Sequence, residues 1–222
     1  MQKQKSWRVI LLGIIYLGVS IAGFALNVQK QDMQAVGMGV VALLTPWILP
    51  LLMRLCRLKM TEEMWIIDLL FTFFASLIGS CFGGYGVPFF DKVLHFISGI
   101  LVTNVAVMLF QWIVHAAEWQ DARTWRIFLL FITFANLATA VLWEFYEYFM
   151  LVVFNNDAIH HYDSGVHDTM TDMLCAFCAG LIVTALFVRE WKSGKKNIFS
   201  RLTQHFYEVN HEERADNALK KE

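Results

Sequence analysis

The stretch IFLLFITFANLATAVLWEFYEYFMLVV, residues 127–153, decides the fold class, because it could cross a membrane as one helix yet contains Glu144 and Glu147. About 20 apolar residues in a helix span the roughly 30 Å of hydrocarbon, and a helix satisfies its own backbone hydrogen bonds there. An ionisable side chain in that region costs about 2.5 to 3.5 kcal/mol and usually faces a bundle interior or a functional site. The stretch therefore predicts a membrane helix and a place to search for function.

The rest of the chain is also strongly hydrophobic. Hydrophobic residues make up 57% of the 222 residues and charged residues only 17%, far from the balance of a soluble domain. The alternating pattern of a membrane barrel is missing. We expect an all-α fold, a polytopic membrane helical bundle whose six transmembrane helices cover residues 7–26, 35–53, 64–82, 93–117, 127–153 and 170–188.

The expected domain organisation is one transmembrane domain, residues 1–190, followed by a cytoplasmic tail, residues 191–222. Apolar residues recur at helical spacing beside basic ones in this tail, so part of it is interpreted as an amphipathic helix on the inner leaflet. Within the bundle, Pro46 and Pro50 are expected to bend or end the second span, because proline removes a helical hydrogen bond. The tail offers no chemistry of its own.

The basic residues predict the orientation of the bundle. Of the 18 Lys and Arg residues, all but Lys30 and Lys92 fall before or at the very start of the first span, after the last one, or in alternate loops between them. Cytoplasmic loops carry the excess of Lys and Arg in membrane proteins. Both termini are therefore predicted to be cytoplasmic.

Acids and histidines gather in three motifs at the predicted outer ends of the last three spans. These motifs are FDKVLHF at 90–96, WEFYEYF at 143–149 and HDTMTDM at 167–173. The acidic and histidine pairs within them are three or four residues apart, so each pair shares one helix face. Their expected depths overlap, which makes one shared cluster feasible.

Side-by-side carboxylates must be protonated, countered by Lys92 or histidine, or bridged by a cation. Carboxylates and imidazoles are ligands of zinc, manganese and iron, and bundle-core metal sites use Glu and His at such spacings. We therefore predict a divalent metal site with ligands from His95, Glu147, Asp91 and Asp168, and with Glu144 and Asp172 as catalytic residues.

Structural interpretations of the same residues stay open beside the metal site. His95 could form an ion pair or hydrogen bond with a neighbouring acid, and the two glutamates could clamp helices together. Asp168 could simply cap its helix. The loop residues His160 and His161 are interpreted as solvated, and Asn136 is expected to be able to hydrogen-bond between helices.

At these motifs the chain resembles the YjdF-type family of bacterial inner-membrane proteins. The shared pattern runs from a D-x-x-x-H helix start through a paired-glutamate helix to a D-T-x-x-D-M helix, over about residues 89–180. Gly165 and His167 depart from the acidic residue and tryptophan that many relatives carry before the last motif. A looser similarity extends to VanZ-like proteins. The resemblance implies a multi-pass protein of the bacterial cytoplasmic membrane and no established activity.

Three functions remain open. The first is an enzyme acting on a lipid head group or an envelope precursor, with a metal-activated water as nucleophile and Glu144 as general base. The second is a proton- or cation-coupled transporter. The third is a non-catalytic membrane component whose acidic cluster clamps helices or binds a partner. Small residues in the last span permit close packing within the chain or in a homo-oligomer. No phosphate loop, nucleophile elbow or nucleic-acid patch is present.

Overall fold

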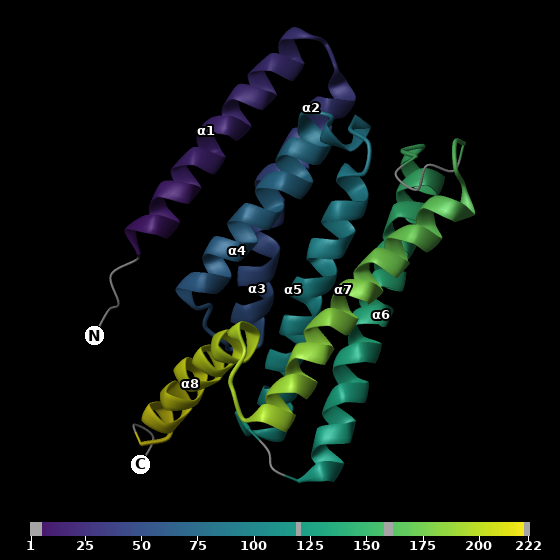
Figure 1. The fold of residues 1–222 in the computed structure, drawn as a ribbon. Coiled ribbons are helices and arrows are strands. Elements are labelled where there is room, and N and C mark those ends of the chain that lie inside the picture. Colours follow the sequence, from purple (N-terminus) through teal and green to yellow (C-terminus); the bar gives the residue numbers. More distant parts are fainter. Residues whose placement is uncertain (1–5, 119–120, 158–161, 220–222) are drawn as a thin grey trace. The chain divides into compact units, whose positions relative to one another are not determined.

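The computed structural model describes residues 6–118, 121–157 and 162–219, and these residues form helices and no strands (Figure 1). Six helical segments in this part of the chain are long and apolar enough to cross a membrane, which confirms the all-α, six-span prediction. The segments are Trp7–Gln29, Met33–Leu55, Glu62–Cys81, Phe90–Val114, Ala122–Phe154 and Val166–Ser193.

The first span is the single helix α1, Trp7–Gln29, whereas the second is interrupted. It consists of α2, Met33–Leu44, the 3-10 turn η1, Thr45–Trp47, and α3, Ile48–Leu55. Pro46 lies in η1, because proline suits the first turn of a helix and cannot donate within one. The break expected at this proline is therefore present.

The third span changes its helical form partway. Its first half is α4, Glu62–Thr72, and its second half is the π-helix η2, Phe73–Cys81, which nothing in the sequence predicted. The 3-10 turn η3, Gly84–Gly86, then leads toward α5, Phe90–Val114. Gly83 has a φ of 75° before this turn, a conformation that glycine adopts without steric cost.

The last two spans are the long helices α6, Ala122–Phe154, and α7, Val166–Ser193. Helix α6 begins earlier than predicted because the Asp121 side chain accepts from the Thr124 backbone N–H at 2.7 Å and caps it. The same N–H lowers the pKa of Asp121 below its usual range. Helix α7 ends at Ser193 and is followed by Gly194, whose φ of 68° is the left-handed conformation that glycine adopts after many helices. Helix α8, Ile198–Leu219, lies within the predicted tail.

In the part of the chain that the structure describes, the contacts form two compact units, one within residues 6–91 and 209–219 and one within residues 92–208. In the first unit, Tyr16, Ala42, Leu77 and Cys81 form a buried cluster, and the Tyr16 hydroxyl donates to the Ala42 carbonyl at 2.6 Å. Within α8, the side chain of Asn210 accepts from the Lys59 N–H and donates to the Lys59 carbonyl.

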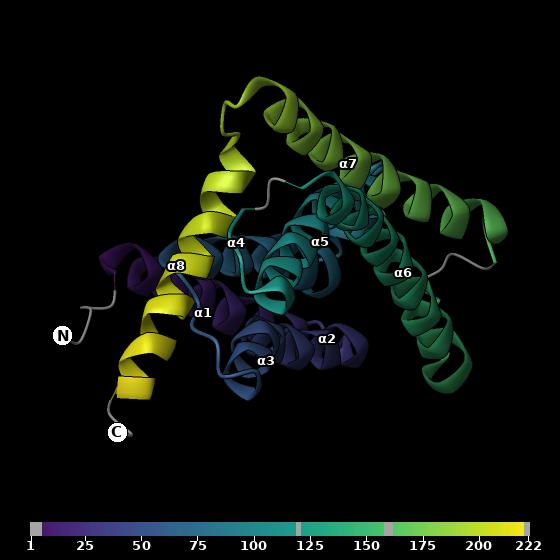
Figure 2. The ribbon, with the colours of Figure 1, turned by 90° about the horizontal axis from the view of Figure 1, so that it is seen from below.

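The second unit contains α5, α6 and α7, which lie beside one another in both views (Figure 2). Small residues let these helices approach closely: a Cβ added to Gly99 would lie 2.2 Å from the Ala176 carbonyl oxygen. Asn136 donates to the Gly99 carbonyl at 2.9 Å and to Thr103 at 3.0 Å, which confirms the expected bond between helices. These contacts set the positions of the three polar motifs.

Below the motifs, the second unit has an apolar core. It is made by seven buried side chains of α5, α6 and α7, namely Ala106, Val107, Phe110, Phe128, Ile132, Val183 and Phe187. All three helices therefore contribute apolar side chains to one shared cluster.

Candidate metal site in the second unit

Three of the predicted site residues come together in the second unit. His95 near the start of α5 and Glu144 in α6 are 7% and 5% exposed, and Glu147 is half-buried. One ligand atom from each, an imidazole nitrogen and two carboxylate oxygens, lie within 4.8 Å of one another. His95, Glu144 and Glu147 therefore form a set whose geometry suits a metal ion.

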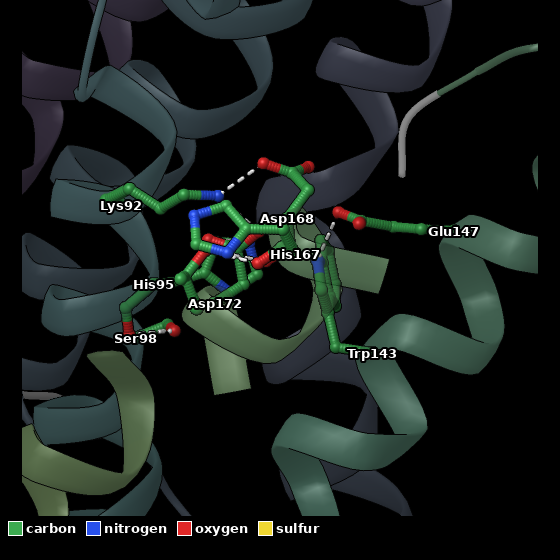
Figure 3. Close-up of polar contacts among 9 residues, drawn as sticks. Lys92, His95, Ser98, Trp143, Glu147, His167, Asp168 and Asp172 are labelled. Atoms are coloured by element: carbon green, nitrogen blue, oxygen red, sulfur yellow. Dashed lines mark hydrogen bonds and ion pairs between the residues drawn. The ribbon is translucent and has the colours of Figure 1, made fainter. Parts of the chain in front are cut away.

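Helix geometry and neighbouring donors position these side chains. Glu144 and Glu147 are one turn apart on α6, so both carboxylates face the same side of that helix. Trp143 donates from its indole nitrogen to Glu147 Oε1 at 2.8 Å, as Figure 3 shows. This bond restricts the Glu147 side chain and leaves its carboxylate near the two buried ligands.

Next to this set, Lys92 of α5 joins two acids of α7. Its ammonium nitrogen lies 2.6 Å from Asp168 Oδ1 and 2.7 Å from Asp172 Oδ2. The exposed fractions of the side chains are 24% for Lys92, 13% for Asp168 and 1% for Asp172. Figure 3 shows Lys92 extending toward Asp168 from the neighbouring helix. Short distances and burial make these strong, charge-assisted contacts.

The histidine–glutamate set and the group of Lys92 with its two aspartates adjoin each other at His95. Its Nε2 atom lies 3.8 Å from Asp172 Oδ1, beyond hydrogen-bond distance but close enough for electrostatic coupling. Taken together, the two groups contain four carboxylates, those of Glu144, Glu147, Asp168 and Asp172, and one ammonium group, that of Lys92. A cation bound by the first group would balance this excess of negative charge.

The other acids and histidines of the motif region lie near helix starts or outside the described residues. Asp91 is the last residue of the first unit and lies in the first turn of α5, four residues before His95. His167 is exposed at the start of α7. His160 and His161 lie outside the described residues.

Two residues of the site were absent from the predicted set. Lys92 entered the sequence analysis only as a possible counter-ion, and Trp143 did not enter it. Both residues could have been found from the sequence. Lys92 is the one Lys or Arg within the three motifs, and Trp143 is four residues before Glu147, on the same helix face. Their partners depend on helix rotation, which residue spacing does not show.

Comparison with known proteins identifies the family. The family described as "Predicted membrane protein (DUF2238)" matches residues 9–193. The chain belongs to this family. The match is compatible with the resemblance to the YjdF-type family, and it extends beyond the motifs to include the first three spans. No curated protein and no solved structure matches the chain significantly.

Proposed function

We propose that the second unit binds a divalent metal ion through His95, Glu144 and Glu147 and uses it in a hydrolase-like reaction. The observation that carries the proposal is the convergence of three ligand atoms within 4.8 Å, two of them from side chains at least nine-tenths buried. Burying such groups in a membrane helix bundle is costly and usually reflects a functional need.

The donor set fits zinc, manganese or iron. Ligands about 2.1 Å from one tetrahedral ion are about 3.4 Å from one another, so small side-chain movements would close the site. Three protein ligands leave a position open, which is typical of catalytic rather than structural metal sites. A divalent ion here would supply Lewis acidity and activate water at neutral pH.

The neighbouring residues support a catalytic role. Asp172 Oδ1 lies 3.8 Å from His95 Nε2, so a small side-chain movement would let this carboxylate accept from the imidazole and orient it. Asp172 lies beside His95 and outside the proposed set of His95, Glu144 and Glu147, so it is the candidate for the general base. Lys92 would hold the Asp172 carboxylate in place through their 2.7 Å contact.

The proposed setting is the bacterial cytoplasmic membrane, with both termini in the cytoplasm and the site at the outer face. The uneven distribution of Lys and Arg supports this orientation. A site at that depth can reach a lipid head group or an envelope precursor, which we propose as the substrate class.

The test is head-group release by the full chain reconstituted into vesicles of phosphatidylethanolamine and phosphatidylglycerol, loaded with zinc, manganese or iron in turn. We expect water-soluble phosphate compounds to appear by mass spectrometry and Glu147→Gln to reduce their release at least 100-fold. Glu208→Gln, an exposed acid on α8, is the matched control. Release that is absent from wild type, or unchanged in Glu147→Gln, would refute the reaction.

A transporter is the second candidate, because Lys92 pairs with the buried Asp172 in a membrane helix bundle as in many proton relays. Proton or cation flux into sealed vesicles that disappears in Asp172→Asn would support it. If neither flux nor head-group release occurs, the contacts of Lys92 with Asp168 and Asp172 act as a clamp between α5 and α7.

A further inference from the structure

The second unit contains a cavity of about 460 Å³ at the opposite end of its helices from the metal site. Gln111, in the cavity lining, is sixteen residues beyond His95 on α5, or about 24 Å along the helix. The volume falls in the range of small-molecule sites. The cavity is therefore independent of the proposed metal site.

Aromatic side chains form much of the cavity wall. Phe128 is fully buried and Phe187 is 7% exposed, so this part of the wall belongs to the packed core. Trp125 and Trp191 stack with ring centroids 4.5 Å apart and planes 9° apart. Such rings present electron-rich faces that attract cations as well as apolar groups.

Gln111 supplies a buried polar group to this wall. It is 3% exposed, and its Nε2 atom donates to the Ala117 carbonyl at 3.0 Å. Its Oε1 atom is buried and accepts no hydrogen bond from any residue that the structure describes. A buried acceptor without a donor costs about 1 to 3 kcal/mol, so a ligand with an N–H group would relieve this penalty.

The charged residues of the lining favour a positive ligand. Lys196 pairs with Glu118 and also contacts Gln204, so its charge is already balanced. Glu190 accepts from Asn197 through Oε2 at 2.8 Å and 2.7 Å, both from neutral donors. The carboxylate of Glu190 therefore keeps a negative charge at the cavity.

We propose that this cavity, the aromatic pocket, binds an organic ammonium ion with an apolar body. The ammonium group donates to Gln111 Oε1 and is attracted by Glu190, while the apolar body packs against Trp125, Phe128 and Phe187. The same chemistry occurs in a free amphipathic amine and in the ethanolamine head group of a lipid. Both sources present an ammonium group beside an apolar chain.

The experiment is calorimetric titration of the detergent-purified full chain with 2-phenylethylammonium. 2-Phenylethanol and 3-phenylpropionate serve as neutral and anionic probes of similar shape. We expect saturable binding of the ammonium probe, at least tenfold weaker binding of the other two, and at least tenfold weaker ammonium binding in Gln111→Leu and in Glu190→Gln.

Asn104→Leu is the matched control, because Asn104 is another buried amide of α5, bonded to the Ile100 carbonyl and outside the pocket lining. This variant should bind the ammonium probe like wild type. Equal binding of the three probes, no binding by the folded wild type, or equal losses in Asn104→Leu and Gln111→Leu would overturn the proposal.

The two sources of the ammonium group are separated by repeating the titration in nanodiscs. If binding of the probe weakens in phosphatidylethanolamine relative to phosphatidylglycerol, the lipid head group occupies the pocket. If binding is the same in both lipids, the pocket takes a free amine. The Glu190→Gln variant distinguishes binding in the pocket from general partitioning of the probe, since the substitution removes a charge with little change in side-chain shape.

Discussion

The ammonium nitrogen of Lys92 in α5 lies 2.7 Å from Oδ2 of Asp172 in α7, a carboxylate that is only 1% exposed. The contact joins two membrane-spanning helices beside His95, so it affects both helix packing and the electrostatics of the candidate metal site. A buried carboxylate depends on such a partner, because breaking a buried ion pair leaves an uncompensated charge.

We predict that Lys92→Met destabilises the metal-free protein and strengthens its affinity for divalent cations. The loss should be near the lower end of the roughly 3 to 5 kcal/mol found for broken buried pairs, since Lys92 is partly exposed. Removal of a positive charge beside the carboxylates should favour a bound cation. Thermal unfolding in detergent, with and without Zn²⁺ or Mn²⁺, measures both effects.

The double variant Lys92→Met with Asp172→Asn is the control for this prediction. Neutralising both partners should recover much of the lost stability and reduce the gain in cation affinity. A single variant as stable as wild type would show that the pair contributes nothing to the fold.

Close packing of α5 on α7 gives a second prediction, for Gly99→Ala. The added methyl group would lie 2.2 Å from the Ala176 carbonyl oxygen, a backbone atom that moves only with its helix. We expect a loss of about 1 to 3 kcal/mol, the usual effect of overpacking, together with weaker metal binding as the helices separate.

Gly13→Ala provides the comparison, because a Cβ at Gly13 would meet nothing within 4 Å. Its melting temperature should be equal to or higher than that of wild type, since alanine favours helix more than glycine. Similar melting temperatures for the two alanine variants would contradict the close approach of Gly99 to Ala176.

Much of the fold could be predicted from hydropathy alone. The six spans agree with the structure to within a few residues at most ends, because span length and apolar character are local properties. The helix break at Pro46 was also predictable, because proline lacks the N–H of a helical hydrogen bond. The π-helix Phe73–Cys81 was not, since its sequence has no proline or other local signal that would distinguish it from an α-helix.

The candidate site could be predicted only in part. Helical spacing indicated that the acids and His95 share faces and depths, yet it could not show how α5, α6 and α7 are rotated about their axes. That rotation depends on Gly99, Asn136 and Gly180, which determine how closely the helices pack. As a result, the division into a histidine–glutamate set and a Lys92–aspartate set appears only in the structure.

The proposed orientation predicts a labelling pattern for single cysteines. Cys56 is exposed in the loop after the second span, and Tyr162, 73% exposed, lies between the last two spans. In intact bacterial spheroplasts, an impermeant maleimide should label Tyr162→Cys, made in a background lacking the other cysteines. Cys56 should react only after the membrane is opened, and the reverse pattern would contradict cytoplasmic termini.

The metal content of the purified full chain is the direct measure of ion binding by His95, Glu144 and Glu147. Protein exposed to zinc, manganese and iron and then freed of unbound metal should retain about one ion per chain by elemental analysis. The folded His95→Ala, Glu147→Gln variant should retain almost none, while Glu208→Gln retains as much as wild type. Metal-free folded wild type, or full metal content in the folded double variant, would contradict a metal site at His95, Glu144 and Glu147.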